Sequence, residues 1–250
     1  MKYTKLGTSD LNVSRIVLGC MRIADKPLER TERLLEAAMG AGVNMFDHAD
    51  IYGGGESERL FGLALKNTGI AREKIVVQSK CGIRKGMFDF SKQHILEAAE
   101  GSLKRLGTEY LDALLLHRPD ALMEPDEIFA AFDELYRSGK VRQFGVSNFS
   151  VSQTRLLEGG RYPIAANQLQ FSLMHAGMVD EGLNVNMMKG ESVERGGEIL
   201  DYCRLKRITV QAWSPLNFGM FEGIFVGNER FPELNAKLEG LAEKYACTPA

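Results

Sequence analysis

The chain has 250 residues, and its 31 basic and 33 acidic side chains leave a formal net charge of −2. Hydrophobic residues make up 44% and charged residues 26%, an ordinary globular composition in a chain long enough for one large α/β domain. This balance excludes the strongly basic surface that nucleic acid or an anionic membrane requires, so neither is a predicted partner.

Targeting and metal-binding signals are weak. No apolar segment follows Met1–Lys5 as a secretory signal would require, and no apolar run approaches the ~18 residues of a membrane span. Cysteines are widely scattered and form no C-x-x-C pair, so neither zinc nor a disulfide framework is favoured, and no metal site is predicted. We expect a cytoplasmic protein with free thiols.

The first half of the chain alternates predicted strands with predicted helices. It begins with a β-hairpin at residues 3–15, whose turn contains Gly7. The elements expected next are a strand at 16–20, a helix at 27–42, a strand ending at Asp47, a helix from about Glu56, a strand at 75–80, a helix from the N-cap Ser91 to Gly107, and a strand at 114–117.

The second half continues the alternation. Its expected elements are a helix at 125–139, a strand at 141–148, a helix opened by a capping box at Ser150–Gln153, a strand at 165–171, a helix at 197–207, a strand at 208–214 and a helix at 232–245. Residues 174–197 have no clear period and are predicted to be an excursion from the sheet.

This alternation predicts βαβ units and a parallel sheet, which fits either a doubly wound sheet or a closed barrel. A dinucleotide-binding doubly wound domain would carry G-x-G-x-x-G after its first strand, and the sequence lacks that pattern. Polar residues at the ends of several successive strands are typical of a barrel. We therefore predict an α/β fold, a (β/α)8-type TIM barrel with an N-terminal hairpin, as a single domain over residues 1–250.

The stretch around Asp47 is the focus of the sequence. An apolar strand runs into Asp47, and the chain then turns through Tyr52 into the glycines at 53–55. Lys80 ends the next apolar run, and His117 ends the one after it. Because the carboxyl ends of parallel strands share one edge, these four side chains are predicted to meet.

Each of these residues also has a structural explanation. Asp47 alone could cap a strand end, Lys80 alone could be a solvated strand end, and His117 alone could be a satisfied buried histidine. Trp213 alone is most often a core residue. The joint pattern is what favours a functional site.

Four motifs in order are similar to those of the aldo-keto reductase superfamily, which comprises NAD(P)H-dependent carbonyl reductases on a TIM barrel. The matching segments are Phe46-Asp47-x-Ala49-Asp50-x-Tyr52-Gly53, Ser79-Lys80, Leu115-Leu116-His117 and Gly145-Val146-Ser147-Asn148-Phe149. The resemblance continues through Trp213-Ser214-Pro215-Leu216 and so covers essentially the whole chain.

The resemblance implies a role for each catalytic candidate. Tyr52 would be the general acid that protonates the carbonyl oxygen, and Lys80 the ammonium that lowers the pKa of a group ordinarily near 10. Asp47 would pair with Lys80, and His117 would orient the substrate carbonyl. The implied partner is a small-molecule carbonyl compound, and the oligomeric state stays open.

The resemblance also implies a cofactor site. Ser147, Asn148 and Gln168 match positions that hydrogen-bond the nicotinamide carboxamide, and Trp213 matches an aromatic that stacks on its ring. Ser214 and Leu216 match a segment that wraps the pyrophosphate. The expected cofactor is NADP(H), with NAD(H) possible.

The C-terminal end departs from the family pattern. No segment before Ala250 matches the eighth βα unit, which carries the contacts to the adenosine 2′-phosphate and closes the barrel in relatives. An exposed edge between the first and seventh strands is therefore expected. Two alternatives to an active enzyme stay open: a cofactor-binding regulatory protein on the same barrel, and an inactive fragment.

Overall fold

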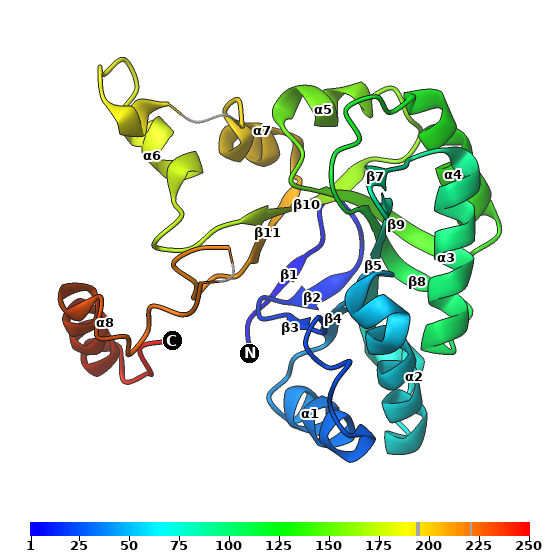
Figure 1. Ribbon diagram of the computed structural model, residues 1–250, viewed down its shortest axis with the longest axis horizontal. Coiled ribbons are helices and arrows are strands. Elements are labelled where there is room, and N and C mark those ends of the chain that lie inside the picture. Colours follow the sequence, from blue (N-terminus) through cyan, green and yellow to red (C-terminus); the bar gives the residue numbers. More distant parts are fainter. Residues whose placement is uncertain (194–195, 221) are drawn as a thin grey trace.

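The computed structural model describes residues 1–193, 196–220 and 222–250. The predicted excursion at 174–197 therefore includes two residues, 194 and 195, that lie outside the described part. The described chain folds as a curled parallel sheet with helices along its outer face (Figure 1).

Seven strands form the curled sheet, in the order β11-β10-β9-β8-β5-β4-β3, and every neighbouring pair is parallel. Their bounds are β3 Leu18–Gly19, β4 Met45–Asp47, β5 Val76–Cys81, β8 Leu111–Leu116, β9 Val141–Ser147, β10 Ile164–Gln170 and β11 Thr209–Trp213. Spatial order follows chain order, so each βα unit adds one strand beside the last. This arrangement confirms the predicted α/β barrel-type fold.

The helices formed by the described residues are α1 Leu28–Gly40, α2 Glu56–Thr68, α3 Lys92–Leu106, α4 Pro125–Arg137, α5 Val151–Leu156, α6 Gly177–Leu183, α7 Ile199–Lys206 and α8 Pro232–Tyr245. Helices α1 to α4 bury their apolar faces against the sheet. The predicted signals set several ends: Ser91 caps α3, Gly107 ends it at φ 65°, and Ser150 and Gln153 form a capping box on α5.

The N-terminal hairpin closes one end of the barrel. Strands β1 (Tyr3–Lys5) and β2 (Asn12–Ser14) pair antiparallel, and the neighbouring Leu6 packs in an apolar cluster with residues from the starts of the barrel strands. At Gly7 a side chain would lie 2.6 Å from the carbonyl oxygen of Ala165, so only glycine allows this approach. The Gly7 N–H donates to Thr209 Oγ1 at 2.7 Å. The opposite, carboxyl end of the strands is left for a ligand.

The structure corrects several predicted boundaries. The first barrel strand is shorter than expected, and β8 begins at Leu111 rather than 114 because its early residues also pair with β9. A second hairpin, β6 (Ile83–Arg84) with β7 (Met87–Phe88), was not predicted, since two-residue strands carry no periodic signal. Helix α6 and a short 3-10 turn at Gly190–Ser192 lie inside the predicted excursion.

The edges of the sheet are β3 and β11, each with one partner strand in the described part of the chain. This matches the expected open edge between the first and seventh barrel strands. Helix α8 stands apart from the sheet in Figure 1, and its Leu241 and Tyr245 are exposed. None of the helices formed by the described residues has the length and apolar character that a membrane-spanning segment needs.

Candidate active site

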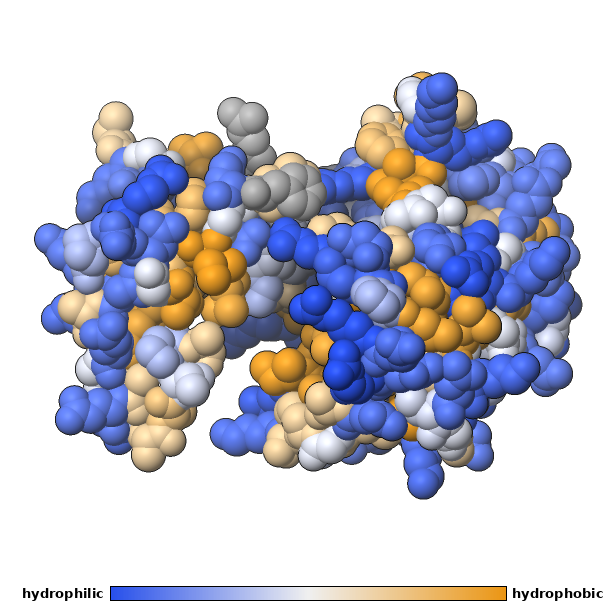
Figure 2. All heavy atoms as spheres, turned by 60° about the horizontal axis from the view of Figure 1, so that its bottom comes forward, coloured by the Kyte–Doolittle hydropathy of each residue, from blue (hydrophilic) through white to orange (hydrophobic). Residues whose placement is uncertain are grey.

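A large cavity of about 1120 Å³ lies inside the curled sheet, bounded at one end by the hairpin. The space-filling view shows the molecule hollowed between its smaller and larger parts (Figure 2). Eight of the ten site residues predicted from sequence line this cavity: Asp47, Tyr52, His117, Ser147, Asn148, Gln168, Trp213 and Ser214. A volume of this size can hold a dinucleotide-sized ligand beside a small molecule.

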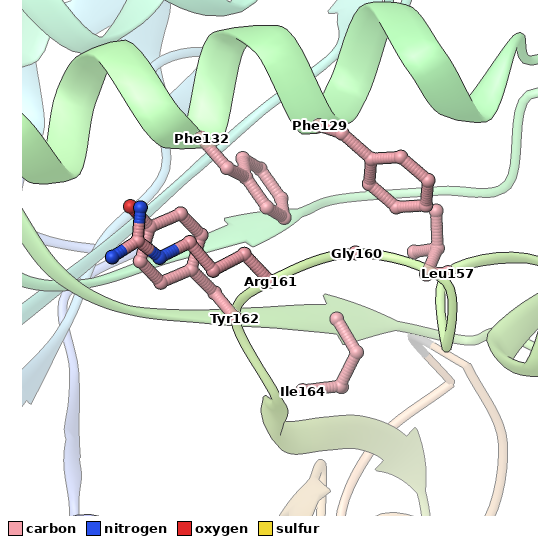
Figure 3. A pocket seen from close by; sticks show the side chains of 7 residues that line it. All are labelled: Phe129, Phe132, Leu157, Gly160, Arg161, Tyr162 and Ile164. Carbon is pink, nitrogen blue, oxygen red and sulfur yellow. The ribbon is translucent and has the colours of Figure 1, made fainter.

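A second hollow is too small for a ligand. It lies between α4 and the segment leading into β10, with Phe129 and Phe132 on one side and Tyr162 on the other (Figure 3). Its volume is about 10 Å³, which is space for about one water molecule. We therefore place the candidate site in the large cavity.

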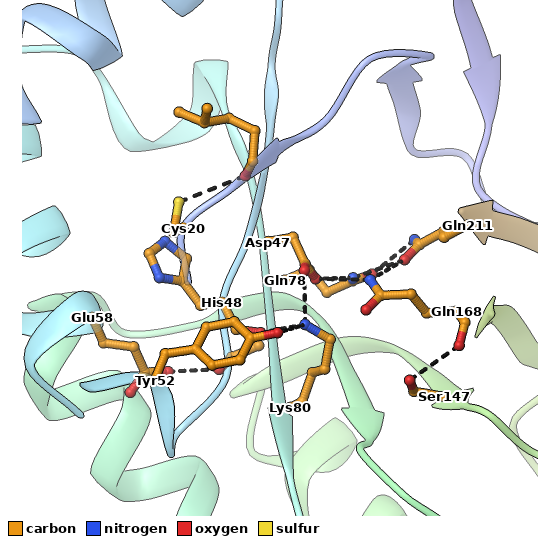
Figure 4. A network of polar contacts seen from close by, with 12 residues as sticks. Cys20, Asp47, His48, Tyr52, Glu58, Gln78, Lys80, Ser147, Gln168 and Gln211 are labelled. Carbon is orange, nitrogen blue, oxygen red and sulfur yellow. Dashed lines mark hydrogen bonds and ion pairs between the residues drawn. The ribbon is translucent and has the colours of Figure 1, made fainter. Parts of the chain in front are cut away.

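Lys80 lies at the centre of the site and is fully buried. Its Nζ donates to Asp47 Oδ2 at 2.7 Å, to the His48 carbonyl at 2.8 Å and to Tyr52 Oη at 3.2 Å (Figure 4). Burial alone would lower the pKa of this ammonium, but the charges of Asp47 and Tyr52 outweigh burial and raise the pKa above its ordinary value. Lys80 is therefore a charged, fully paired group.

Tyr52 is placed by a glycine turn. It begins the 3-10 turn Tyr52–Gly55, in which Gly53 and Gly54 have positive φ of 59° and 64°. A side chain at Gly53 would lie 2.3 Å from Ala24 Cβ, so this position requires glycine for space as well as for conformation. The turn holds the Tyr52 ring edge-on to His117, with ring centroids 5.8 Å apart. The four predicted catalytic side chains thus meet.

Burial and Lys80 act on the pKa of Tyr52 in opposite directions. Burial raises the pKa of the Tyr52 hydroxyl and outweighs Lys80, which lowers it as predicted, so the net direction is upward. At neutral pH the Tyr52 hydroxyl keeps its proton.

His117 is neutral at physiological pH. Burial lowers the pKa of its imidazole to about 3, and the charge of Lys80 adds to the effect. Its backbone N–H donates to the Cys81 carbonyl at 2.9 Å, which fixes the residue directly after β8. Its Nδ1 is buried without a hydrogen-bond partner among the described residues.

Asp47 is supported by a cluster of three glutamines, of which the sequence analysis assigned only Gln168 to the site, as a contact to the nicotinamide. The Gln78 amide donates to Asp47 Oδ1 at 2.5 Å, and Gln168 donates to the same oxygen at 3.1 Å. Gln211 accepts from both glutamines, at 2.9 and 3.0 Å, and donates to Gln78 Oε1 at 2.9 Å. Strand alternation was the available signal, since Gln211 shares a face with Trp213 on β11.

The residues predicted for the nicotinamide also lie together. Ser147 Oγ donates to the Gln168 carbonyl at 3.0 Å, Asn148 donates to Ser147 Oγ at 2.7 Å, and Trp213 Nε1 donates to Asn148 Oδ1 at 3.0 Å. Ser147, Asn148, Gln168, Trp213 and Ser214 all line the cavity. Leu216 is not among the described residues that line it, so the structure does not bring its side chain to the site.

Strand β5 divides its side chains between the two faces of the sheet. Lys80 points into the cavity side, toward Asp47, whereas Ser79 donates to Glu58 on α2 at 2.5 Å. Glu58 is fully buried and pairs with Arg105 at 2.7 Å. Cys81 packs in the apolar cluster under the helices and so faces away from the cavity. No group of three or more metal-ligating side chains occurs among the residues that the structure describes.

The burial of His48 should make the stability of the fold sensitive to acid. Its ring is fully buried edge-on to Phe61, with no hydrogen-bond partner for either nitrogen in the described chain, and burial lowers its pKa to about 3. In the unfolded chain His48 is protonated below about pH 6.5, whereas in the folded chain it stays neutral down to about pH 3. The free energy of unfolding therefore falls as the pH falls from about 6.5 toward 3. At about pH 5 this linkage costs about 2 kcal/mol.

Between about pH 7.5 and pH 5 the unfolding free energy of the wild type should fall further than that of His48→Leu. The expected difference between the two losses is about 2 kcal/mol. Urea unfolding at both values measures this difference. His175→Leu, at an exposed position, is the matched control and should follow the wild type. An acid loss that is equal in wild type and His48→Leu would contradict the assignment.

Comparison with known proteins decides the family. The model of the Aldo/keto reductase family matches residues 15–250. The chain belongs to this family. It is thus an oxidoreductase of a family that uses nicotinamide cofactors, which confirms the resemblance found in the sequence.

Named relatives agree with the family assignment. The chain is 40% identical over 223 residues to the uncharacterized oxidoreductase YcsN of Bacillus subtilis, covering 84% of this chain and 69% of that protein. It is 37% identical over 243 residues to the oxidoreductase YdhF of Escherichia coli, covering 92% and 74%. A solved structure of the thermostable aldo-keto reductase Tm1743, in complex with the inhibitor epalrestat, aligns with a TM-score of 0.75 at 28% identity and covers 100% of this chain and 82% of that one.

Proposed function

We propose that the protein reduces an aldehyde or ketone to an alcohol with NAD(P)H, with Tyr52 as the general acid. The observation that carries the proposal is the placement of Lys80 Nζ, 2.7 Å from Asp47 Oδ2 and 3.2 Å from Tyr52 Oη, beside the His117 ring. Carbonyl reduction needs a proton donor at the oxygen, and Tyr52 is the protonated hydroxyl that faces the cavity.

Each residue of the site has one task in this proposal. Tyr52 donates its proton to the carbonyl oxygen, and Lys80 stabilises the phenolate that this leaves. Asp47 keeps Lys80 charged, and the glutamine amides hold Asp47 in place. Neutral His117 donates a hydrogen bond that orients the carbonyl, since an imidazole with a pKa of about 3 carries one N–H at neutral pH.

The cavity suits a nicotinamide cofactor. Ser147, Asn148 and Gln168 offer hydroxyl and amide groups to the carboxamide, and Trp213 offers its ring. When bound, the cofactor supplies the hydride. Ser214 and Leu216 belong to the segment that we propose to wrap the pyrophosphate, Ser214 at the cavity and Leu216 through its backbone. We propose NADP(H) as the cofactor, with NAD(H) as the alternative, and residues 1–250 as one domain of a cytoplasmic protein.

The test of this proposal is the oxidation of NADPH and NADH in the presence of simple aldehydes, followed by absorbance loss and by identification of the alcohol. We expect steady turnover in which NADPH and alcohol change in equal amounts. Cofactor binding without turnover would instead favour the regulatory alternative, and binding of neither cofactor would contradict the proposed site.

The pKa directions predict the pH dependence of turnover. Tyr52 keeps its proton because burial raises its pKa above the usual value near 10, and His117 stays neutral above about pH 3. We therefore expect kcat/KM for carbonyl reduction to change less than about threefold between about pH 5 and 9. Oxidation of the alcohol needs the phenolate, so it should rise up to about tenfold per pH unit over the same range. A reduction profile with a midpoint near pH 6.5 would contradict these assignments.

A further inference from the structure

Arg118 is an arginine without an anionic partner at the mouth of the cavity. It follows His117 directly, in the loop after β8, and lines the cavity. Its guanidinium lies 5.8 Å from the centre of the Trp213 ring, and its side chain is partly buried. Within the described chain, neither an ion pair nor a hydrogen bond engages this guanidinium, which leaves its N–H groups available to a ligand.

The charges that face the cavity are unbalanced. Three arginines line it, Arg15, Arg22 and Arg118, whereas Asp47 is the only carboxylate among its described lining residues. Asp47 is already paired with Lys80 at 2.7 Å. An unpaired guanidinium that is partly removed from water is a strong binding group for an oxyanion, because hydrogen bonds to charged partners gain strength as water is excluded.

The position of Arg118 assigns it to the substrate rather than to the cofactor. The proposed cofactor residues come from β9, β10 and the segment that begins at β11, whereas β8 lies between β9 and β5, the strand that carries Lys80. Arg118 follows β8, next to His117, whose ring lies edge-on to Tyr52 with centroids 5.8 Å apart. A group bound to Arg118 would therefore sit beside the carbonyl that Tyr52 and His117 hold.

We propose that Arg118 is a specificity-determining residue that binds a carboxylate on the substrate, so that the preferred substrates are aldehydes or ketones carrying a carboxylate. This inference rests on the proposed carbonyl reduction. A guanidinium can bind a carboxylate or a phosphate through two parallel N–H donors, and a single guanidinium matches the single charge of a carboxylate. Phosphate sites usually add further donors from backbone N–H groups.

The test compares 4-carboxybenzaldehyde with its neutral methyl ester, methyl 4-formylbenzoate. We expect the wild type to show at least a tenfold higher kcat/KM for the acid, the effect of one charge-assisted hydrogen bond or pair of bonds. Arg118→Met should lower kcat/KM for the acid about tenfold to a hundredfold and leave the ester within about twofold. Arg118→Lys should keep part of the preference, and the KM for NADPH should not change.

Two controls separate the possible causes. Arg33→Met removes an exposed arginine on α1 that does not line the cavity, and it should behave as wild type. Binding is read without turnover through Trp213, the only tryptophan of the chain, by titrating its fluorescence with 4-methylbenzoate and with the uncharged 4-methylbenzyl alcohol. Arg118→Met should weaken binding of the benzoate at least about tenfold and leave the alcohol unaffected.

Each failure has a distinct meaning. Equal activity of the wild type on acid and ester would overturn the role of Arg118 and leave carbonyl reduction standing. An Arg118→Met variant that loses acid and ester activity equally would also overturn it. The preference of the wild type for glyceraldehyde 3-phosphate over glyceraldehyde is compared with its preference for the acid over the ester. If the phosphate preference is the larger of the two, the carboxylate assignment is overturned. No turnover with any carbonyl compound would overturn the proposed function itself.

Discussion

Replacing Tyr52 with phenylalanine should lower kcat for carbonyl reduction by about 10²–10⁴-fold, the usual contribution of general acid catalysis. The substitution removes the hydroxyl that lies 3.2 Å from Lys80 Nζ and keeps the ring that packs edge-on to His117. The measurement is steady-state kinetics with one aldehyde at saturating NADPH. The geometry of the ring contact predicts a folded variant, so the loss should lie in the chemical step.

Two further measurements on Tyr52→Phe test whether the loss of activity lies in the chemical step. Cofactor affinity should change less than about threefold, because the residues proposed for the nicotinamide lie on β9, β10 and β11. The melting temperature should change little, since Tyr52 lies in the turn Tyr52–Gly55 beside the cavity and is not part of the apolar core. Near wild-type turnover in Tyr52→Phe would remove this residue from the role of acid.

Breaking the Asp47–Lys80 pair should damage both activity and stability, but unequally for the two partners. Asp47→Ala leaves the fully buried Lys80 ammonium without its carboxylate, which can cost about 3–5 kcal/mol of unfolding free energy. Lys80→Met should cost less, because Asp47 still accepts hydrogen bonds from Gln78 at 2.5 Å and from Gln168 at 3.1 Å. Both variants should lose at least about a hundredfold in kcat.

Urea unfolding of the two single variants and of the double variant Asp47→Ala/Lys80→Met measures this asymmetry. The double variant contains no unpaired buried charge, so it should be more stable than Asp47→Ala alone. Additive losses in the double variant, or an unchanged stability in Asp47→Ala, would show that the two side chains do not depend on each other.

The sequence predicted the strand-end residues well because their signal is local. Asp47, Lys80 and His117 each follow an apolar run, and a parallel sheet brings such ends to one edge whatever the details of packing. The glycine run after Tyr52 likewise predicts an unusual backbone conformation from local sequence, and all three of its residues have positive φ in the structure.

Other features depend on contacts between distant segments and could not be predicted. The link between Gln78 and Gln211 spans 133 residues, and nothing in either strand alone indicates that they meet. The net pKa of Tyr52 depends on how far burial outweighs Lys80, which only the packed site determines. Arg118 follows a motif residue, yet its role depends on the lack of an ion-pair partner in the described fold. Helix α6 was missed because its seven residues are too few for a clear period.

The central claim is that this cavity carries out hydride transfer to a carbonyl carbon beside Tyr52. It is tested most directly by incubating the protein with an aldehyde and NADPH deuterated at the transferring carbon of the nicotinamide, and analysing the alcohol by mass spectrometry. The account predicts one deuterium on the alcohol carbon in the wild type, formed about 10²–10⁴-fold more slowly by Tyr52→Phe. Alcohol without deuterium, or labelled alcohol formed equally fast by both proteins, would contradict it.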